Sequence, residues 1–234
     1  MLNSIIIEGI DRLGKNTLIS GIKNRLGFFQ EIHYQKPEIL DHYVKQARQV
    51  LNVPDDYDGA NVKSLAQKLY QAASFIDMMK LLSTDVPFIM NRAHLGEAVY
   101  SHRYRGYSGD YVFNLEQNYP AFLDNTLLVL LHTSSFDFIK DDGLSFNFDK
   151  KDEEQMDFIR AFEKSQVKHK LLLDVNDGSG NFVAPEKLLE VVIHAFNELQ
   201  TMSQQIMYTT WFKDSDGSLN RRNTLQPNTS RIVN

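Results

Sequence analysis

The chain has 234 residues with no cysteine, 42% hydrophobic and 24% charged residues, and a formal net charge of -5 at pH 7. This length and composition are typical of one globular domain with a single core, with two small domains as the alternative. The lack of cysteine excludes disulfides and thiolate metal sites, and the acidic balance argues against broad nonspecific binding to nucleic acid or anionic membranes. No basic segment followed by a long apolar stretch opens the chain, and the longest apolar runs are strand-sized, so the sequence predicts a cytoplasmic protein that does not span a membrane.

A strand, a glycine-bearing loop and a helix follow one another at the N-terminus. The apolar run Ser4–Glu8 stops at Gly9, and a Gly-x-x-x-x-Gly-Lys stretch then opens a helical pattern over Lys15–Leu26 that stops at Gly27. Glycines let backbone N–H groups turn inward around a phosphate, and the helix N-terminus and Lys15 add positive charge. The layout predicts a phosphate-binding loop, with a plain strand–turn–helix as the alternative. The candidate nucleotide-binding residues are Gly9, Leu13, Gly14, Lys15, Asn16 and Thr17.

Further apolar runs alternate with helical patterns along the chain, which predicts a parallel sheet wrapped by helices. The remaining predicted strands are Glu31–Gln35, Val86–Met90, Thr126–Leu131 and Lys170–Val175. The remaining predicted helices are Pro37–Val50, Asn61–Leu82, Tyr111–Asp124, Asp152–Ser165 and Pro185–Gln200. Pro120 is expected to mark a kink or the last turn of the helix that contains it.

Two polar segments interrupt this pattern. The stretch from Asp141 to Lys150 is a glycine-bearing insert, read either as a lid over a bound nucleotide (about 140–152) or as an ordinary surface connection. From Thr201 onward the chain is polar and turn-rich, with few apolar residues. The sequence therefore predicts one domain over 1–200 and a loosely packed or partner-dependent tail over 201–234.

The N-terminal motif carries a family resemblance. Residues Glu8 to Lys15 closely resemble the opening of thymidylate kinases, which read Glu-Gly-x-Asp-x-x-Gly-Lys-Ser-Thr. The segment from Asn91 to Tyr100 resembles the Asp-Arg-Tyr segment of the same family, and the element order agrees over about residues 3–200. The chain thus resembles P-loop nucleoside monophosphate kinases of the thymidylate kinase type, similar to the diverged versions of bacteriophages.

The resemblance implies a three-layer α/β P-loop kinase fold, with a five-stranded parallel sheet flanked by helices and a lid insert. It also implies a homodimer that uses ATP and Mg²⁺ to phosphorylate a pyrimidine (deoxy)nucleoside monophosphate. Its implied catalytic residues are Arg12, leaning over the transferring phosphoryl group, Lys15 on the donor phosphates, and Arg92 on the acceptor phosphate. Asp11 is implied to accept a hydrogen bond from the sugar 3′-hydroxyl, and Tyr100 to pack beside the sugar or base.

The chain departs from the family where a metal would bind. Asn16 stands in place of the Ser or Thr that ligates Mg²⁺, and Asn91 replaces the aspartate of the Asp-Arg pair. An amide oxygen can bind a hard cation, which makes Asn16 the candidate metal ligand, whereas Thr17 points about a hundred degrees away around the helix. Glu8 or Glu97 is hypothesised to supply the missing carboxylate, and Glu97 is also a candidate substrate residue.

The acceptor side departs as well. The family's base-reading arginine has no counterpart, so Gln71 and Ser74 are the candidates to face the base. The run from His102 to Tyr107 concentrates positive charge and aromatic rings, and Tyr104 and Arg105 within it are candidate substrate residues. The same run is read alternatively as solvated surface or as a contact for a polynucleotide phosphate.

Two rival functions follow from these departures. The basic-aromatic run favours a kinase that acts on a nucleoside or on hydroxymethylated bases within DNA. The asparagines at positions 16 and 91 favour a nucleotide-binding protein with impaired catalysis.

Overall fold

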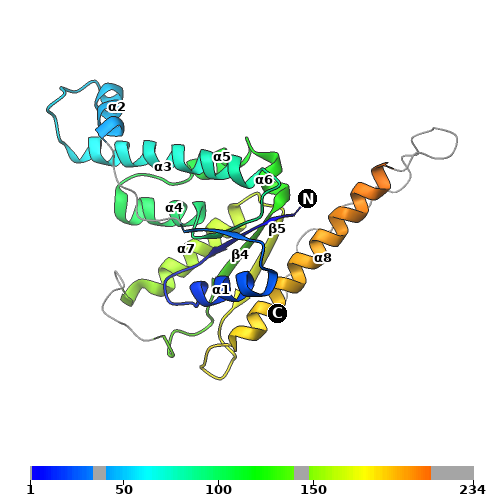
Figure 1. The fold of residues 1–234 in the computed structure, drawn as a ribbon. Helices are drawn as coiled ribbons and strands as arrows, with labels where there is room; N and C mark the ends of the chain where they lie inside the picture. Colours follow the sequence, from blue (N-terminus) through cyan, green and yellow to red (C-terminus); the bar gives the residue numbers. More distant parts are fainter. Residues whose placement is uncertain (1, 34–40, 140–147, 212–234) are drawn as a thin grey trace.

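The computed structural model describes residues 2–33, 41–139 and 148–211 (Figure 1). Its strands form one parallel sheet in the order β2-β3-β1-β4-β5, and each falls on a predicted run. The strands are β1 (Ser4–Glu8), β2 (Gln30–His33), β3 (Phe88–Asn91), β4 (Thr126–His132) and β5 (His169–Asp174). All of β1 is buried, as expected for the central strand of a sheet covered on both faces, whereas β2 lies exposed at one edge.

Helices cover both faces of the sheet (Figure 1). Helix α1 (Lys15–Leu26) packs against α8 (Pro185–Trp211) on one face. The opposite face carries α3 (Ala60–Leu82), α4 (His94–Tyr100), α5 (Tyr111–Glu116), α6 (Pro120–Asn125) and α7 (Lys151–Lys164). Helix α2 (Asp41–Leu51) packs on α3 through a small separate cluster centred on Ala47, Val62 and Ala66. The remaining elements are a π-helix, η1 (Ser101–Arg105), and a 3₁₀ turn, η2 (Phe148–Lys150).

Two glycines set the ends of α1. Gly14 precedes the helix at φ 82°, and Gly27 follows it at φ 72° with its N–H donating to the carbonyl of Lys23 at 2.8 Å. The left-handed conformation at Gly27 is the common way for a helix to stop, because the carbonyls of the last turn then find donors. The predicted bounds of this helix are confirmed.

The predicted single helix over Tyr111–Asp124 is wrong. The structure forms α5 and α6 instead, and Pro120 stands in the first turn of α6 rather than at a kink or a last turn. Tyr119 adopts φ -128° and ψ 70°, because a residue before proline is driven away from helical angles. A proline at the start of a helix is well tolerated, since its missing N–H would have no partner there.

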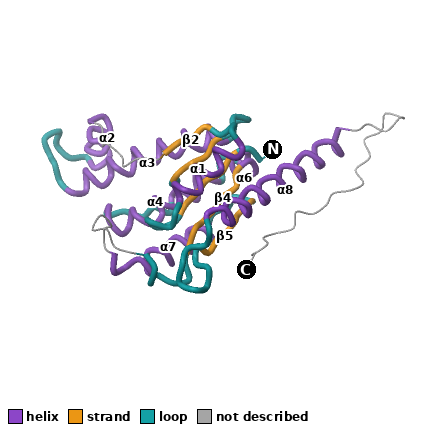
Figure 2. Tube along the Cα trace, turned by 60° about the horizontal axis from the view of Figure 1, so that its bottom comes forward, coloured by secondary structure: helices purple, strands orange, loops and turns teal. Residues whose placement is uncertain are grey.

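The C-terminal helix is longer than predicted. Helix α8 runs without a break to Trp211 and extends past the sheet (Figure 2), so the expected boundary between 200 and 201 falls inside it. Residues 212–234 of the expected tail, and 140–147 of the expected lid, lie outside the described residues. No helix in the described ranges combines the length and apolar character needed to cross a membrane.

Candidate functional site

The loop between β1 and α1 has a conformation that requires its glycines. At Gly9, with φ 134°, an added Cβ would lie 2.5 Å from the carbonyl oxygen of Leu131 on the neighbouring strand β4. At Gly14 the space around an added Cβ is open, and the requirement is the left-handed backbone alone. Leu13 is buried in the core, so only its backbone is available to a ligand. The loop is therefore anchored at one side and open at the other.

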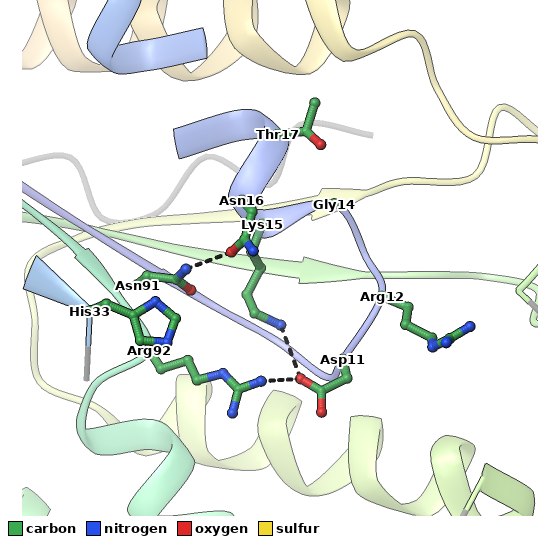
Figure 3. A pocket seen from close by; sticks show the side chains of 9 residues that line it. All are labelled: Asp11, Arg12, Gly14, Lys15, Asn16, Thr17, His33, Asn91 and Arg92. Atoms are coloured by element: carbon green, nitrogen blue, oxygen red, sulfur yellow. Dashed lines mark hydrogen bonds and ion pairs between the residues drawn. The ribbon is translucent and has the colours of Figure 1, made fainter. Parts of the chain in front are cut away.

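A cavity of about 310 Å³ lies beside this loop at the carboxyl ends of β1, β2 and β3 (Figure 3). In open α/β sheets this edge is where ligands bind. The residues that line the cavity are Asp11, Arg12, Gly14, Lys15, Asn16, Thr17, His33, Asn91 and Arg92. Three of these side chains are lysine or arginine and one is a carboxylate, so the cavity suits an anion. The structure thus brings together both motifs that carry the family resemblance.

Lys15 reaches back over the loop. Its ammonium donates to the carbonyl oxygens of Gly9 at 2.8 Å and Ile10 at 2.6 Å, and it lies 3.9 Å from Asp11 Oδ1. Burial lowers the pKa of Lys15 to about 8, the Asp11 carboxylate opposes the shift, and nearby positive groups, including Lys151, contribute to it. Burial therefore disfavours the charged form of Lys15 at the cavity wall, and a bound anion would stabilise that form.

Arg92 also lines the cavity. It follows β3 in a left-handed conformation, with φ 65°, and its N–H donates to the carbonyl of Ile7 at 3.1 Å. Its guanidinium forms an ion pair with Asp11 Oδ1, and both side chains are partly exposed (Figure 3). The side chain of Arg12 extends from the loop away from this pair (Figure 3). Lys15 and Arg92 therefore meet at Asp11, and Arg12 extends separately from the loop.

Asn16 and Asn91 are hydrogen-bonded to each other at the cavity wall. The Asn91 Nδ2 group donates to Asn16 Oδ1 at 2.6 Å, although the residues are far apart in sequence. Asn91 is 2% exposed, and its own Oδ1 is buried with no hydrogen-bond partner. The amide oxygen of Asn16, which the sequence offers as the metal ligand, is thus already engaged.

Glu8, one of the two carboxylates hypothesised to replace the missing metal ligand, is fully buried beneath α4 and does not line the cavity. Its Oε1 accepts hydrogen bonds from backbone N–H groups around the start of that helix, and burial raises its pKa. The donors are Ala93 at 2.8 Å, Leu95 at 3.1 Å and Gly96 at 3.4 Å. A carboxylate in this position caps the positive end of the helix.

Glu97, the other hypothesised carboxylate, is also buried away from the cavity. It accepts hydrogen bonds from the hydroxyls of Tyr107 at 2.8 Å and Tyr111 at 2.9 Å, and it forms an ion pair with Arg105. Together these contacts tie α4 to η1 and α5.

The other candidate substrate residues lie along α4 and η1, outside the cavity lining. The Tyr100 hydroxyl donates to Glu154 at 2.9 Å, and its ring stacks on Tyr104 with centroids 5.9 Å apart. Burial raises the pKa of Tyr100, as does the nearby Glu154 carboxylate. Arg103 donates from Nε to Asp157 at 2.7 Å on α7. The positive charge of the basic-aromatic run is thus largely neutralised by acidic neighbours.

His33 is a cavity residue that the sequence does not single out. It ends β2 and pairs in register with Asn91 on β3. The signal that identifies it is positional, because side chains at the carboxyl ends of neighbouring parallel strands meet at one edge. Lys151, buried at the start of α7, is a second residue that the sequence does not single out. It does not line the cavity, but its positive charge contributes to the lowered pKa of Lys15.

No protein-family model and no curated protein matches this sequence. The fold is similar to solved structures at low identity. The YorR protein of Bacillus subtilis, in complex with phosphorylated GDP, aligns with a TM-score of 0.56 and 16% identity over 85% of this chain and 98% of that chain. Thymidylate kinase of Ehrlichia chaffeensis aligns with a TM-score of 0.48 and 14% identity over 82% of this chain and 97% of that chain. A gluconokinase of Sinorhizobium meliloti aligns with a TM-score of 0.42 and 12% identity over 89% of this chain and 97% of that chain. The parallel five-stranded sheet, its two layers of helices and the similarity to the YorR structure confirm the predicted three-layer α/β fold class.

Proposed function

We propose that this protein is an ATP-dependent kinase that transfers the γ-phosphoryl group to a (deoxy)nucleoside monophosphate. The observation that carries the proposal is the placement of Arg12, Lys15 and Arg92 around one cavity beside the glycine loop. Phosphoryl transfer requires in-line positioning of the reactants and neutralisation of charge on the equatorial oxygens, rather than a strong nucleophile. Three cations that line one small cavity supply that neutralisation.

Each cavity residue takes a role in this proposal. Loop amides and the Lys15 ammonium hold the donor phosphates, while Arg92 holds the acceptor phosphate. An oxygen of the acceptor phosphate attacks the γ-phosphorus, the bond from that phosphorus to the β–γ bridging oxygen breaks, and ADP leaves. Arg12 neutralises the transferring group. Asp11 accepts a hydrogen bond from the sugar hydroxyl through Oδ2, because its Oδ1 faces both Arg92 and Lys15.

The loop fits a nucleoside triphosphate better than it fits a protein-held Mg²⁺. A Cβ at Gly9 would strike β4, and the open side of Gly14 leaves room for phosphate oxygens. Mg²⁺ in such sites is usually held by one or two carboxylates together with substrate phosphates. Among the described residues, the carboxylate that lines the cavity is that of Asp11, and it is already paired with Arg92. Within the described residues, no cluster of three or more acidic, histidine or cysteine side chains is placed to hold a metal.

A nucleotide is the ligand class that the fold neighbour also favours, since YorR is a similar fold in complex with phosphorylated GDP. From the family resemblance we take a pyrimidine dNMP, dTMP-like or modified, as the first acceptor to test, and a cytoplasmic homodimer as the assembly. In this proposal Tyr100 and Tyr104 flank the acceptor. Glu97, which is buried, pairs with the partly exposed Arg105, and this ion pair positions α4.

The polynucleotide alternative loses part of its support in the structure. Its basis is the basic run, but Arg105 is paired with Glu97 and Arg103 with Asp157. The impaired-catalysis alternative keeps a specific observation in its favour, namely the mutual engagement of the two asparagines at the cavity wall.

The test is ADP formation from ATP and Mg²⁺ with a panel of free nucleoside monophosphates, nucleosides and hydroxymethylated DNA. The proposal expects ADP to form only with one or more free monophosphates. ADP formed with modified DNA alone would establish the polynucleotide alternative. Calorimetric binding of ATP without ADP formation over every acceptor would establish the impaired-catalysis alternative.

Arg92→Met is the matched variant for this assay. It removes the acceptor-side cation and is expected to lower kcat/KM for the acceptor by roughly 100-fold or more, as for the loss of one preorganised charge in a phosphoryl-transfer site. Arg160→Met is the control, because Arg160 is an exposed arginine on α7 that contacts Asp157 at 3.1 Å and does not line the cavity. Equal activity of the two variants would contradict the role of Arg92.

A further inference from the structure

The wall that would hold a metal in related folds is formed here by two neutral amides. Asn16 and Asn91 stand at these two positions and bond to each other at 2.6 Å. Around them the lining carries the three cations Arg12, Lys15 and Arg92 against the carboxylate of Asp11, which pairs with Arg92. A positive lining repels a free divalent cation and attracts an uncomplexed polyphosphate.

Resting on the proposed function, we propose that Asn91 orients Asn16 and that the Asn16 NH₂ group donates directly to phosphate oxygens, so that polyphosphate binding requires no divalent cation. The N–H groups of Asn16 would thus neutralise the phosphate oxygens in the place of a metal ion. The ligand class is a nucleoside triphosphate or inorganic tripolyphosphate in its metal-free form.

The hydrogen-bond inventory of the pair supports donors rather than acceptors. A primary amide has one oxygen and an NH₂ group that donates two hydrogen bonds. The oxygen of Asn16 faces Asn91 and accepts its N–H, whereas both hydrogens of the Asn16 NH₂ group remain to donate to a ligand. The oxygen of Asn91 is buried and cannot reach a cation in the cavity. Bonds from such donors to charged oxygens are stronger than those between neutral groups.

The reversed pair is the competing arrangement. There, Asn16 donates to Asn91 and turns its own oxygen toward the cavity, where it suits a cation instead of a phosphate. The two arrangements predict opposite effects of metal removal, and binding measurements decide between them.

The first experiment titrates the wild-type protein by calorimetry with a nonhydrolysable ATP analogue and with tripolyphosphate. Each titration is run in excess EDTA and in saturating Mg²⁺. The expected dissociation constant in EDTA is lower than, or within about threefold of, the value in Mg²⁺. Weakening of about tenfold or more in EDTA overturns the inference alone, because binding in Mg²⁺ leaves the proposed function intact. Binding in neither condition overturns both.

Two variants at the exposed Asn16 test the donor role directly. Asn16→Ala removes the donors without adding charge and is expected to weaken binding in EDTA by about tenfold, as for the loss of a hydrogen bond to a charged group. Asn16→Asp keeps the shape but presents only acceptors, so binding in EDTA is expected to fall further and to recover with Mg²⁺. Unchanged affinity of both variants in EDTA overturns the inference.

Asn24 supplies the controls. It is an exposed asparagine on the same helix and does not line the cavity. Asn24→Ala and Asn24→Asp are expected to bind like the wild type in both conditions, which separates the local donor effect from the change in net charge. Circular dichroism melts of all four variants establish that each is folded when titrated.

Discussion

The buried ammonium of Lys15 yields a quantitative prediction about stability. The side chain is 6% exposed, and burial lowers its pKa from 10.5 to about 8. In the free protein the charged form is therefore disfavoured relative to the unfolded chain. Lys15→Met removes this charge, so the free energy of unfolding of the wild type relative to the variant is expected to depend on pH.

The sign and size follow from proton linkage. A lysine whose pKa is lower in the folded state destabilises that state at low pH, and the penalty disappears as pH rises through the unfolded value. From the shift of the Lys15 pKa, the penalty is roughly 3 kcal/mol at pH 7 and about 1 kcal/mol near pH 9.5. The wild type is therefore expected to gain about 2 kcal/mol relative to Lys15→Met over this range. The variant also loses the two hydrogen bonds from Lys15 to loop carbonyls. That loss shifts its curve of unfolding free energy against pH by a constant amount and does not change the slope.

The assay is urea unfolding followed by far-UV circular dichroism, at a series of pH values, without nucleotide. Lys23→Met is the control for losing a lysine, because Lys23 lies on the same helix, is half-exposed, and contacts Glu31 at 2.6 Å. A difference between wild type and Lys15→Met that stays flat from about pH 7 to 9.5 would refute the reasoning. It would mean that the Lys15 ammonium is solvated and that burial does not disfavour its charged form.

Two further predictions concern single buried sites. Gly9→Ala is expected to lower the free energy of unfolding by about 3 kcal/mol or more in urea, because the methyl group meets the Leu131 carbonyl, whereas Gly14→Ala, with open space, is expected to cost only about 1–2 kcal/mol. Equal losses would contradict the close approach to β4. Burial alone would raise the pKa of Glu116, but its hydrogen bond from buried His94 at 2.6 Å, with further donors, lowers it. The stability that Glu116 contributes is thus present above about pH 4.5 and lost below it, so acid titration of Glu116→Gln should lack part of the wild-type decline.

Sequence patterns were sufficient where one local rule decided the structure. The strand Ser4–Glu8 and the helix Lys15–Leu26 agree with the structure at both ends, because Gly9, Gly14 and Gly27 each force a change of backbone direction. Pro120 shows the limit of the same reasoning. Its effect on Tyr119 is local and certain, but whether the chain resumes as a helix depends on packing that the pattern does not contain.

Predicting which residues line the cavity requires the order of the strands in the sheet. Asn16 and Asn91 stand out in the sequence as separate departures, yet their bond exists only because β3 lies beside β1 in the sheet. The same adjacency brings in His33 from β2. Neutralisation of the basic run depends likewise on α7, where Asp157 meets Arg103, and a charge count along the chain cannot show that pairing.

Glu8 explains how the fold keeps Arg92 at the cavity without a metal-bound carboxylate. Its Oε1 accepts N–H groups at the start of α4, and the preceding residue, Ile7, accepts the N–H of Arg92 itself. Two adjacent residues at the end of β1, Ile7 and Glu8, thus fix the turn that follows β3. Arg92 is held in a left-handed conformation from which its side chain reaches Asp11. The buried carboxyl group of Glu8 therefore has an architectural use, and the cavity keeps its excess of basic groups for an anionic ligand.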